Sequence, residues 1–415
     1  MSDYGVVEIC AGAGGQALGL EKAGFEHELA IELDSNACDT LRLNREKWDV
    51  KQGDVADRDL WNPSDYSGVS LLAGGVPCPP FTIAGKQLGA EDERDLFAWA
   101  IELVDEVKPR ALLLENVRGL SMPRFAGYRQ HVLDRLTELG YVAEWQLLNA
   151  SDFGVPQLRP RFVLVALRPE DAAYFAWPET DEEPSTVGEV LKDLMAANGW
   201  EGADEWAKAA NKIAPTIVGG SKKHGGADLG PTRAKRAWAE MGVDALGIAN
   251  DAPGPGDKFG VGPKLTTEMV ERIQGWLPDK GFSWKFAGRK TATYRQIGNA
   301  FPPPVAAAVG SAIMRAFQHE GEPNERQPVE HDPIYKALRS SGEFMTQAQI
   351  ARASGRDFDA PELERRISVL SRDFDVEVRN GKSSTAYKLG EFRAFTGQEG
   401  HARHELFLKH RAKIS

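Results

Sequence analysis

The chain has 415 residues, 42% of them hydrophobic and 27% charged, with a formal net charge of −11. This length predicts two or three domains, and the composition is that of a globular protein. The absence of any run of about 18 apolar residues excludes a membrane-spanning helix, and the first residues show no secretory signal pattern. The three cysteines, Cys10, Cys38 and Cys78, lack metal-ligand spacing. We therefore expect no metal site, no disulfide framework and a cytoplasmic location.

Two short segments are basic although the whole chain is acidic. Residues 222–236 carry five basic side chains against Asp228, and residues 401–415 carry four against Glu405. Phosphate contacts are local, so such segments can bind nucleic acid on an acidic protein. Solvated surface charge is the alternative explanation for each segment.

The first 170 residues alternate short apolar runs with helical patterns. Strands are predicted at residues 6–10, 28–31, 70–74, 111–115 and 161–167. Helices are predicted at residues 16–23, 35–45, 96–107 and 127–139. Strands that alternate with helices predict a parallel sheet in an α/β layer fold.

Regular patterns weaken from about residue 170 to 265, where Gly and Pro are frequent, and this predicts a separate loop-rich region. Helical patterns return at residues 266–276 and 304–317. Residues 319–332 are polar and read as a linker.

The segment after the linker has its own pattern of three helices and a hairpin. The helices are predicted at 333–340, at 346–353 with a capping box from Thr346 and Gln349, and around Leu363, Ile367 and Leu370. The hairpin strands are predicted at 376–379 and 386–389, joined at Asn380-Gly381. This order resembles a winged helix-turn-helix.

A glycine-rich turn and two acids follow the first three strands of the predicted sheet. Residues 8–15 hold Gly12, Gly14 and Gly15 between a strand and a helix, where the backbone can approach a nucleotide-like ligand closely. Glu32 ends the next strand and could accept hydrogen bonds from ribose hydroxyls. Asp54 ends the third and could bind an adenine amino group. Each acid could instead cap a helix, but the series favours a cofactor that contains adenosine.

Cys78 stands in Gly74–Phe81, a loop with three prolines directly after a strand. A lone cysteine is more often a small buried hydrophobe than a nucleophile. Here, however, prolines fix the backbone around it at the carboxyl edge of the sheet, where ligands bind. The loop therefore predicts a reactive thiol.

Three further segments carry polar residues in patterns that suggest a site. Glu115 ends the apolar strand before Asn116, where burial would raise its pKa and suit a proton donor; a carboxylate that simply reaches solvent is the alternative. Arg159 and Arg161 alternate as they enter a strand, and they could bind phosphate and a base carbonyl or be surface charges. Residues 294–303 read as a glycine turn before a helix that could complete the cofactor pocket.

In this order, the Ala-Gly-Ala-Gly-Gly, Pro-Cys-Pro-Pro, Glu-Asn-Val, Gln-x-Arg-x-Arg and Gln-x-Gly-Asn segments resemble the conserved blocks of DNA (cytosine-5)-methyltransferases of bacterial restriction–modification systems. The resemblance extends over residues 4–318. It implies a class I methyltransferase (Rossmann-like) α/β catalytic domain, S-adenosylmethionine as cofactor and S-adenosylhomocysteine as product. It also implies double-stranded DNA as the substrate.

The resemblance assigns roles to individual residues. Cys78 would be the nucleophile, Glu115 the acid that engages the base, Arg161 the contact to the cytosine carbonyl, and Arg159 a support of the catalytic loop. The cofactor pocket would be lined by Cys10, Ala11, Gly12, Gly14, Gly15, Glu32, Leu33, Asp54, Val55, Pro77, Asn299 and Ala300. Candidate DNA contacts are Lys86, Gln87, Lys222, Lys223, His224, Arg233, Lys235 and Arg236.

The predicted domains follow from the same comparison. A catalytic domain would span residues 1–174 and be completed by 285–318. A small irregular target-recognition domain with a bracing helix would span 175–284. The linker at 319–332, a winged-helix-like domain at 333–390 and a basic tail at 391–415 would follow. We expect a monomer, and a cognate restriction endonuclease is a further candidate partner.

Three positions depart from the family pattern. Cys10 replaces an aromatic residue that usually stacks on the cofactor, Pro79 replaces a common Gln, and Trp276 replaces Phe. None removes a residue that the chemistry requires.

The alternative functions are a transfer-RNA cytosine-5 methyltransferase, disfavoured because no cysteine follows Cys78, and a DNA-binding regulator with a degenerate enzyme domain. The C-terminal unit could enter a DNA groove, dock a partner or serve as scaffold.

Overall fold

The structure is a computed structural model that describes residues 3–76, 94–179, 183–219, 227–324, 330–381 and 384–392. Its centre is a seven-stranded sheet with the strand order β3-β2-β1-β4-β5-β7-β6. The strands are β1 Gly5–Ile9, β2 Glu26–Glu32, β3 Val50–Gln52, β4 Leu71–Gly75, β5 Ala111–Val117, β6 Val142–Asn149 and β7 Pro160–Leu167. β1 to β5 are parallel, and β7 is antiparallel to both of its neighbours.

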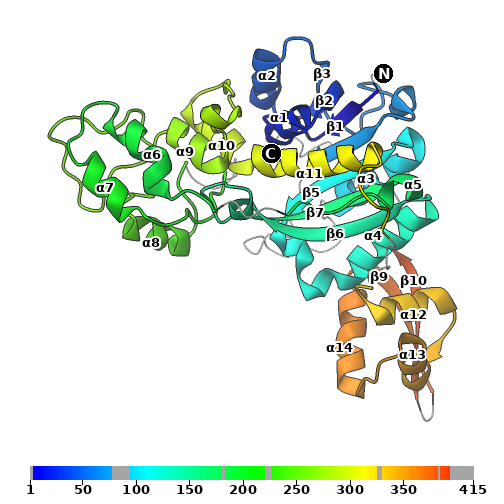
Figure 1. The fold of residues 1–415 in the computed structure, drawn as a ribbon. Helices are drawn as coiled ribbons and strands as arrows, with labels where there is room; N and C mark the ends of the chain where they lie inside the picture. The colour runs from blue at the N-terminus through cyan, green and yellow to red at the C-terminus, as the bar shows by residue number, and fades with distance from the viewer. Residues whose placement is uncertain are drawn as a thin grey trace.

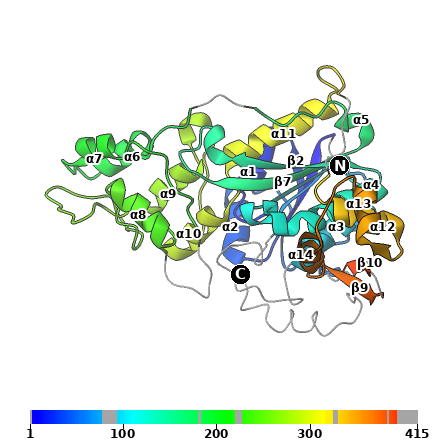
Figure 2. The same ribbon diagram turned by 90° about the horizontal axis from the view of Figure 1, so that it is seen from below.

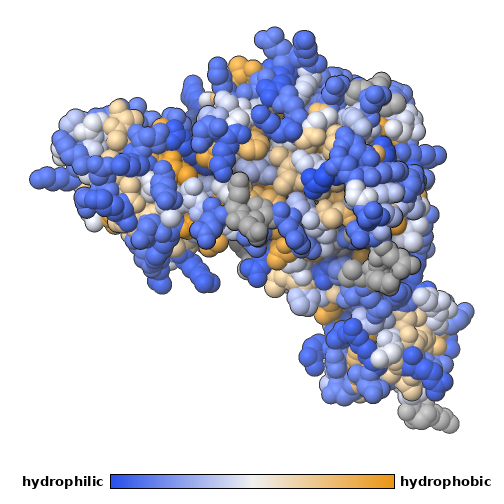
Figure 3. Space-filling view, viewed as in Figure 1, coloured by the Kyte–Doolittle hydropathy of each residue, from blue (hydrophilic) through white to orange (hydrophobic). Residues whose placement is uncertain are grey.

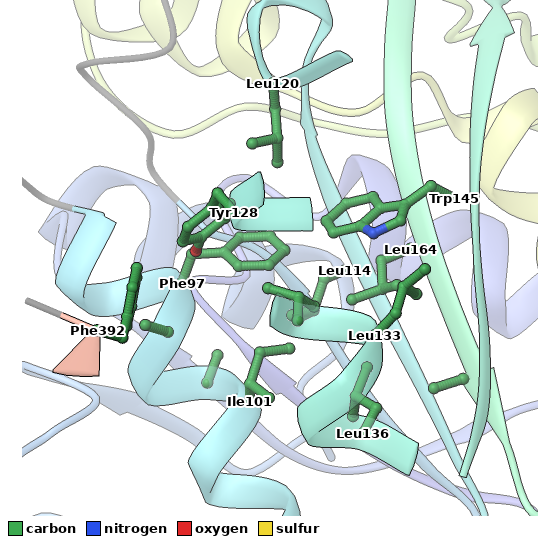
Figure 4. Close-up of a cluster of buried hydrophobic side chains, with 14 of the residues drawn as sticks. Phe97, Ile101, Leu114, Leu120, Tyr128, Leu133, Leu136, Trp145, Leu164 and Phe392 are labelled. Atoms are coloured by element: carbon green, nitrogen blue, oxygen red, sulfur yellow. The ribbon is translucent and has the colours of Figure 1, made fainter. Parts of the chain in front are cut away.

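Helices cover both faces of this sheet (Figure 1). They are α1 Gly15–Lys22, α2 Ser35–Asn44, α3 Arg94–Val107, α4 Ala126–Glu138, α5 Pro169–Ala172 and α11 Pro303–Phe317. Successive strand residues point to opposite faces. Leu112 and Leu114 therefore pack with α3 and α4, whereas Leu113 packs with α1 and α11. Figure 4 shows the first of these cores, in which Phe97, Tyr128 and Trp145 surround Leu114.

Helices α1 and α11 approach closely because Gly19 has no side chain. A Cβ atom at Gly19 would lie 2.5 Å from Ala306 Cβ and 2.6 Å from both the Ala307 nitrogen and the Pro303 oxygen. Two of these three atoms belong to backbone, so the neighbours cannot move aside cheaply. The glycine therefore sets the distance between these helices. α1 begins at the predicted cofactor residue Gly15, and α11 follows the predicted cofactor residues Asn299 and Ala300.

We expect Gly19→Ala to lower the free energy of unfolding by about 1–3 kcal/mol, the range for overpacking a core. Alanine has the better helix propensity by up to about 1 kcal/mol, so a loss would show that the clash outweighs propensity. Urea unfolding measures the change. Gly260→Ala is the matched control, because no atom lies within 4 Å of its Cβ position. Equal stability of the two variants would contradict this account of the packing.

A helical lobe extends from one end of the sheet (Figures 1 and 2). It contains α6 Val187–Ala196, α7 Ala203–Ala209, α8 Thr232–Glu240 and α9 Thr267–Gln274. Trp206 and Trp238 are buried in its core, which also takes in Ile297 of α10, Lys290–Asn299. α10 leads from the lobe back to α11 and the sheet.

A second, smaller unit follows α11. It consists of α12 Pro333–Ser341, α13 Gln347–Ser354, α14 Ala360–Leu370, and the strands β8 Met345–Thr346, β9 Phe374–Asn380 and β10 Thr385–Phe392, in the order β8-β10-β9. Tyr335, Phe374 and Phe392 of this unit share one core with Tyr128 of α4. The unit is therefore packed against the sheet's helical layer.

The predicted elements of the first 170 residues and of the C-terminal unit agree with the structure to within a few residues, and the predicted capping box at Thr346 is present. Other expectations were wrong. No strand was predicted for β6, none of the predicted strand ranges covers β3, and no helix was predicted for α5 to α8. The expected glycine turn at residues 294–299 is part of helix α10, and β7 runs against its neighbours. Within the described residues, no helix is long and apolar enough to cross a membrane.

Candidate active site

The loop after β1 is held in a conformation that leaves open space beside it. Gly12 and Gly14 have φ values of +54° and +89°, and Gly14 is the N-cap of α1. Cys10, a non-glycine residue, also has a positive φ of +50°, which is uncommon outside functional or strained turns. No atom lies within 4 Å of the Cβ position of Gly12, whereas a Cβ at Gly15 would lie 2.3 Å from the Phe301 oxygen. The loop is therefore packed behind Gly15 and open beside Gly12.

The Glu32 carboxylate fixes this loop from the end of β2. It accepts hydrogen bonds from the backbone nitrogens of Gly12 at 2.7 Å and Asp34 at 2.8 Å, one on each oxygen. Burial raises the pKa of the Glu32 carboxyl, and these two donors oppose the shift. The side chain is only half-buried, so it lines the open side of the loop.

The other predicted cofactor residues lie around this edge. Asp54 follows β3 and accepts a hydrogen bond from the Ala56 nitrogen at 2.9 Å, in a turn rather than at the start of a helix. Val55 and Ala11 are buried, and Leu33 is 41% exposed. Asn299 ends α10, and Ala300 links it to α11. Pro77 lies outside the described residues.

The cofactor loop and the start of the cysteine loop are neighbours at the centre of the sheet. Ile9 of β1 pairs with Gly74 of β4, and Gly75 pairs with Glu115 of β5. The strand order reverses between β1 and β4, which is where open α/β sheets bind ligands. Asn116 donates from Nδ2 to the Val76 oxygen at 3.4 Å. Cys78, two residues beyond Val76, lies outside the described residues.

Glu115 and Arg161 form a buried ion pair beside this edge. Arg161 of β7 pairs with Val117 of β5. Glu115, two residues before Val117 on β5, therefore lies on the same face of the sheet as Arg161. Arg161 Nε lies 2.6 Å from Glu115 Oε1, and each side chain is 10% exposed. Both of these atoms are enclosed by the protein, so a ligand would have to contact other atoms of the pair. Burial raises the pKa of the Glu115 carboxyl, and Arg161 and Arg159 oppose the shift.

Arg159 is fully enclosed and binds backbone rather than an acid. Its guanidinium donates to the carbonyl oxygens of Ile217 at 2.7 Å, Gly298 at 2.7 Å and Ala300 at 3.0 Å. These carbonyls belong to the lobe, to α10 and to the link between α10 and α11. Arg159 therefore joins the lobe to the cofactor edge, which is a positioning role.

Gln157 and Tyr294, which lie near Arg159, also hold the lobe in place. The sequence analysis assigned no role to either residue. The Gln157 amide accepts from the Ile217 nitrogen at 2.8 Å and donates to Gln274 Oε1 at 2.7 Å. The Tyr294 hydroxyl contacts the carbonyl oxygens of Val218, at 3.0 Å, and Asp228. Gln157 was visible in the Gln-x-Arg-x-Arg segment, but its partners lie 60 and 117 residues away in sequence.

We expect Arg159→Met to lower the free energy of unfolding by about 3 kcal/mol or more, because it leaves three carbonyls without their charged donor. Thermal or urea unfolding measures the loss. Arg58→Met is the matched control, since the Arg58–Glu106 pair is 49% and 41% exposed and such a pair contributes at most about 1 kcal/mol. A loss no larger than that of the control would mean that Arg159 does not hold the lobe in place.

The predicted DNA contacts are only partly described. Arg233 and Arg236 are exposed on α8. Lys235 is half-buried and pairs with Asp228, with 2.7 Å between Nζ and Oδ2, so its charge is largely compensated. The other predicted contacts lie outside the described residues, namely Lys86, Gln87, Lys222, Lys223 and His224, as do residues 393–415 of the predicted basic tail.

No cluster of His, Cys, Asp and Glu that could hold a metal occurs among the residues that the structure describes.

Known proteins have sequences similar to that of this chain. The family model for C-5 cytosine-specific DNA methylase matches residues 4–315. The chain is 70% identical to the type II methyltransferase M.NaeI of Lentzea aerocolonigenes, over the full length of both chains. It is 52% identical to M.NgoMIV of Neisseria gonorrhoeae over 76% of this chain and 98% of that protein. About a quarter of this chain thus has no counterpart in M.NgoMIV, and the C-terminal unit lies beyond the family match.

Solved structures support the fold. A prophage-encoded DNA modification methyltransferase of E. coli superposes with a TM-score of 0.53 at 20% identity, over 76% of this chain and all of that one. A mutant of Spodoptera frugiperda DNMT2 superposes with a TM-score of 0.53 at 18% identity, over 75% of this chain and all of that one. With the family match and the seven-stranded sheet, they identify the class I methyltransferase fold. The chain belongs to the C-5 cytosine-specific DNA methylase family and is a DNA cytosine-5 methyltransferase.

Proposed function

We propose that the chain methylates C5 of a cytosine that is flipped out of a specific short duplex sequence, through a covalent bond between Cys78 and C6, as the modification enzyme of a restriction–modification system or as an orphan methylase. The observation that carries the proposal is the buried Glu115–Arg161 pair at the carboxyl end of β5. Cys78 follows Val76 by two residues in the sequence, and in our proposal its thiol acts beside this pair.

The chemistry accounts for each of these groups. The Cys78 thiolate adds to C6, and the C5–C6 π electrons make C5 nucleophilic. Glu115 would donate a proton or hydrogen bond at N3, and Arg161 would stabilise the charge that develops at O2. Once C5 carries the methyl group, a base removes the proton from C5, and the C6–S bond breaks to return the thiolate. C6 is hidden in stacked DNA, so the cytosine must be flipped out at a cost of a few kcal/mol.

Methyltransferases of this family use S-adenosylmethionine, which supplies an electrophilic methyl group when it is bound. The open space beside Gly12 and the half-buried Glu32 carboxylate fit an adenosine moiety with ribose hydroxyls. In our proposal Glu32 binds the ribose, Asp54 and Val55 hold the adenine, and Asn299 and Ala300 close the pocket from α10. Cys10, Ala11, Leu33 and Pro77 would line it.

We expect Glu32→Gln to weaken binding of S-adenosylhomocysteine by about tenfold or more, or at least about 1.4 kcal/mol. Glutamine keeps one acceptor oxygen where the carboxylate has two, and its NH₂ group would face a backbone N–H. Calorimetric titration measures the affinity. Glu26→Gln, exposed at the start of the same strand, is the control. Unchanged affinity in Glu32→Gln would exclude Glu32 from the pocket.

One labelling experiment tests both which nucleic acid accepts the methyl group and which atom is methylated. Purified chain with radiolabelled cofactor should transfer the label to duplex DNA, and digestion should release it as 5-methylcytosine. Label on transfer RNA, or release as another methylated base, would contradict the proposal. The comparisons do not favour the transfer-RNA and regulator alternatives.

The remaining expectations from the sequence are predictions. The target-recognition role of the lobe, the winged-helix character of the C-terminal unit and the domain bounds given above belong to this proposal, as do Arg233 and Arg236 as DNA contacts. A cognate restriction endonuclease and a monomeric state are also proposed. Light scattering of the purified chain checks the monomer, and a methylation pattern that blocks one endonuclease identifies the partner system.

A further inference from the structure

Helix α14 of the C-terminal unit presents a polar stripe that the proposed function does not use. Its apolar residues Leu363, Ile367 and Leu370 are buried in the unit's core. The opposite side carries the exposed residues Pro361, Glu364, Arg365 and Ser368. The exposed Arg372 follows in the turn after the helix, two residues beyond Leu370.

Arg365 and Arg372 are not neutralised by neighbours. Within the described ranges, no carboxylate lies within ion-pair distance of Arg365 or Arg372. Arg366 differs from them, because it pairs with Glu362 at 3.1 Å and lies over the Phe358 ring. Glu364 is the one acid on the stripe. The stripe and the turn after it thus offer Arg365 and Arg372 on either side of a small neutral serine, with Glu364 as the one negative charge.

The end of α14 lies near the catalytic edge of the sheet. A Cβ atom at Gly127, in the first turn of α4, would lie 2.4 Å from Leu370 Cδ2. The two short 3-10 turns between β5 and α4, Arg118–Ser121 and Pro123–Phe125, lead from the Glu115 strand to this contact. Arg118 is exposed there, also without an ion pair among the described residues. Arg118 therefore lies on the segment that leads from the active-site edge to the part of α4 that α14 contacts.

The unit is docked firmly enough to hold this orientation. His131 of α4 lies 3.1 Å from the Tyr335 hydroxyl through Nδ1, and its ring is 4.5 Å from that of Phe392. Burial lowers the pKa of His131 to about 4, so the contact is uncharged at neutral pH. In Figures 1 and 2, α14 lies on the side of the unit nearer the lobe, with α12 and α13 on the other side. The α14 side is mainly hydrophilic in Figure 3.

We infer that α14 binds the phosphate backbone of the same DNA duplex that carries the target cytosine, outside the base pairs held by the lobe. The inference rests on the proposed function, which places the duplex at the catalytic edge. Arg365 and Arg372 supply the contacts, and Arg118 continues them toward the active site. Phosphate contacts of this kind position the protein and add affinity without adding sequence information.

The test compares the full-length chain on two duplexes with the same central sequence, taken from the methylated sites found in a host genome. One has about 16 base pairs and the other about 40, so that only the longer one extends several helical turns beyond the centre. The variant is Arg365→Gln/Arg372→Gln. The control is Arg339→Gln/Arg352→Gln, which removes two exposed arginines from α12 and α13 of the same unit. Affinity is measured over a range of salt concentrations.

We expect the variant to bind the longer duplex several-fold more weakly, with a slope of log affinity against log salt that is shallower by about 1.8, or 0.9 for each lost phosphate contact. Its affinity for the short duplex and its rate of methylating it should match those of the unsubstituted chain and the control. An unchanged slope on the longer duplex would overturn the inference and leave α14 to a protein partner. Equal losses on both duplexes, or in the control, would also overturn it. Failure of the unsubstituted chain to methylate the short duplex would instead count against the proposed function.

Discussion

Replacing Cys78 by alanine abolishes methyl transfer, with an expected fall in rate of at least about 10⁴-fold. Without the thiolate, C6 gains no electron pair from the enzyme, and C5 stays too weak a nucleophile to attack the methyl group. Binding of duplex DNA and of S-adenosylhomocysteine should be retained, because neither requires the thiol. Initial rates of label transfer measure the first effect, and calorimetric titration measures the second.

The same variant should also fail to form a covalent adduct. A duplex with 5-fluorocytosine at the target position traps the chain, because the base cannot remove fluorine from C5 and the C6–S bond then persists through denaturing electrophoresis. Cys38→Ala should keep both the activity and the trap, since the Cys38 thiol is buried and donates to the Glu32 carbonyl oxygen at 3.3 Å. An adduct in Cys78→Ala would show that another residue is the nucleophile.

Replacing Glu115 by glutamine should lower the rate by about 10²–10⁴-fold, the usual contribution of a positioned proton donor. The amide keeps the size of the side chain and can donate a hydrogen bond to N3, but it cannot transfer a proton. Affinity for DNA should change much less than the rate, so single-turnover kinetics is the measurement. The matched variant is Glu144→Gln, a change on the edge strand β6, which should leave the rate unchanged. A similar fall in both variants would point to a structural effect.

The pH dependence of the rate distinguishes a Glu115 that transfers a proton from a Glu115 that only donates a hydrogen bond. Burial raises the pKa of the Glu115 carboxyl, so its protonated form persists to higher pH than that of an ordinary glutamate. The rate that depends on this proton should therefore be lost as the pH rises through the raised pKa. Glu115→Gln should lack this alkaline decline, while both enzymes still gain rate as the Cys78 thiol ionises. The same alkaline decline in both would rule out Glu115 as the titrating group.

The local sequence pattern predicts the parallel part of the sheet because buried parallel strands are continuous apolar runs between helical segments. β6 was missed because its residues are neither continuously apolar nor alternating, and Trp145 and Leu148 are its only buried members. The reversed direction of β7 is a matter of chain topology, which a strand's own residues do not encode. The lobe helices α6 to α8 have at most 10 residues each, between Gly- and Pro-rich turns, and so show weak periodicity.

The candidate site likewise contains some residues that local sequence predicts and others that it does not. Gly12, Glu32 and Glu115 could be predicted because each lies at or near the carboxyl end of a strand at the same sheet edge, which local sequence reveals. The role of Arg159 depends on carbonyls of Ile217 and Gly298, 58 and 139 residues away. Tyr294 likewise acts on distant backbone. Such contacts depend on how the lobe is joined to the sheet, which no single segment specifies.

The most direct test of the central claim is bisulfite sequencing of the genome of a bacterium that lacks cytosine methylation and expresses this chain, with a Cys78→Ala strain in parallel. The account predicts protected cytosines in one short sequence context, and none in the Cys78→Ala strain. A fully converted genome from cells that contain the folded chain, or equal protection in both strains, would contradict it.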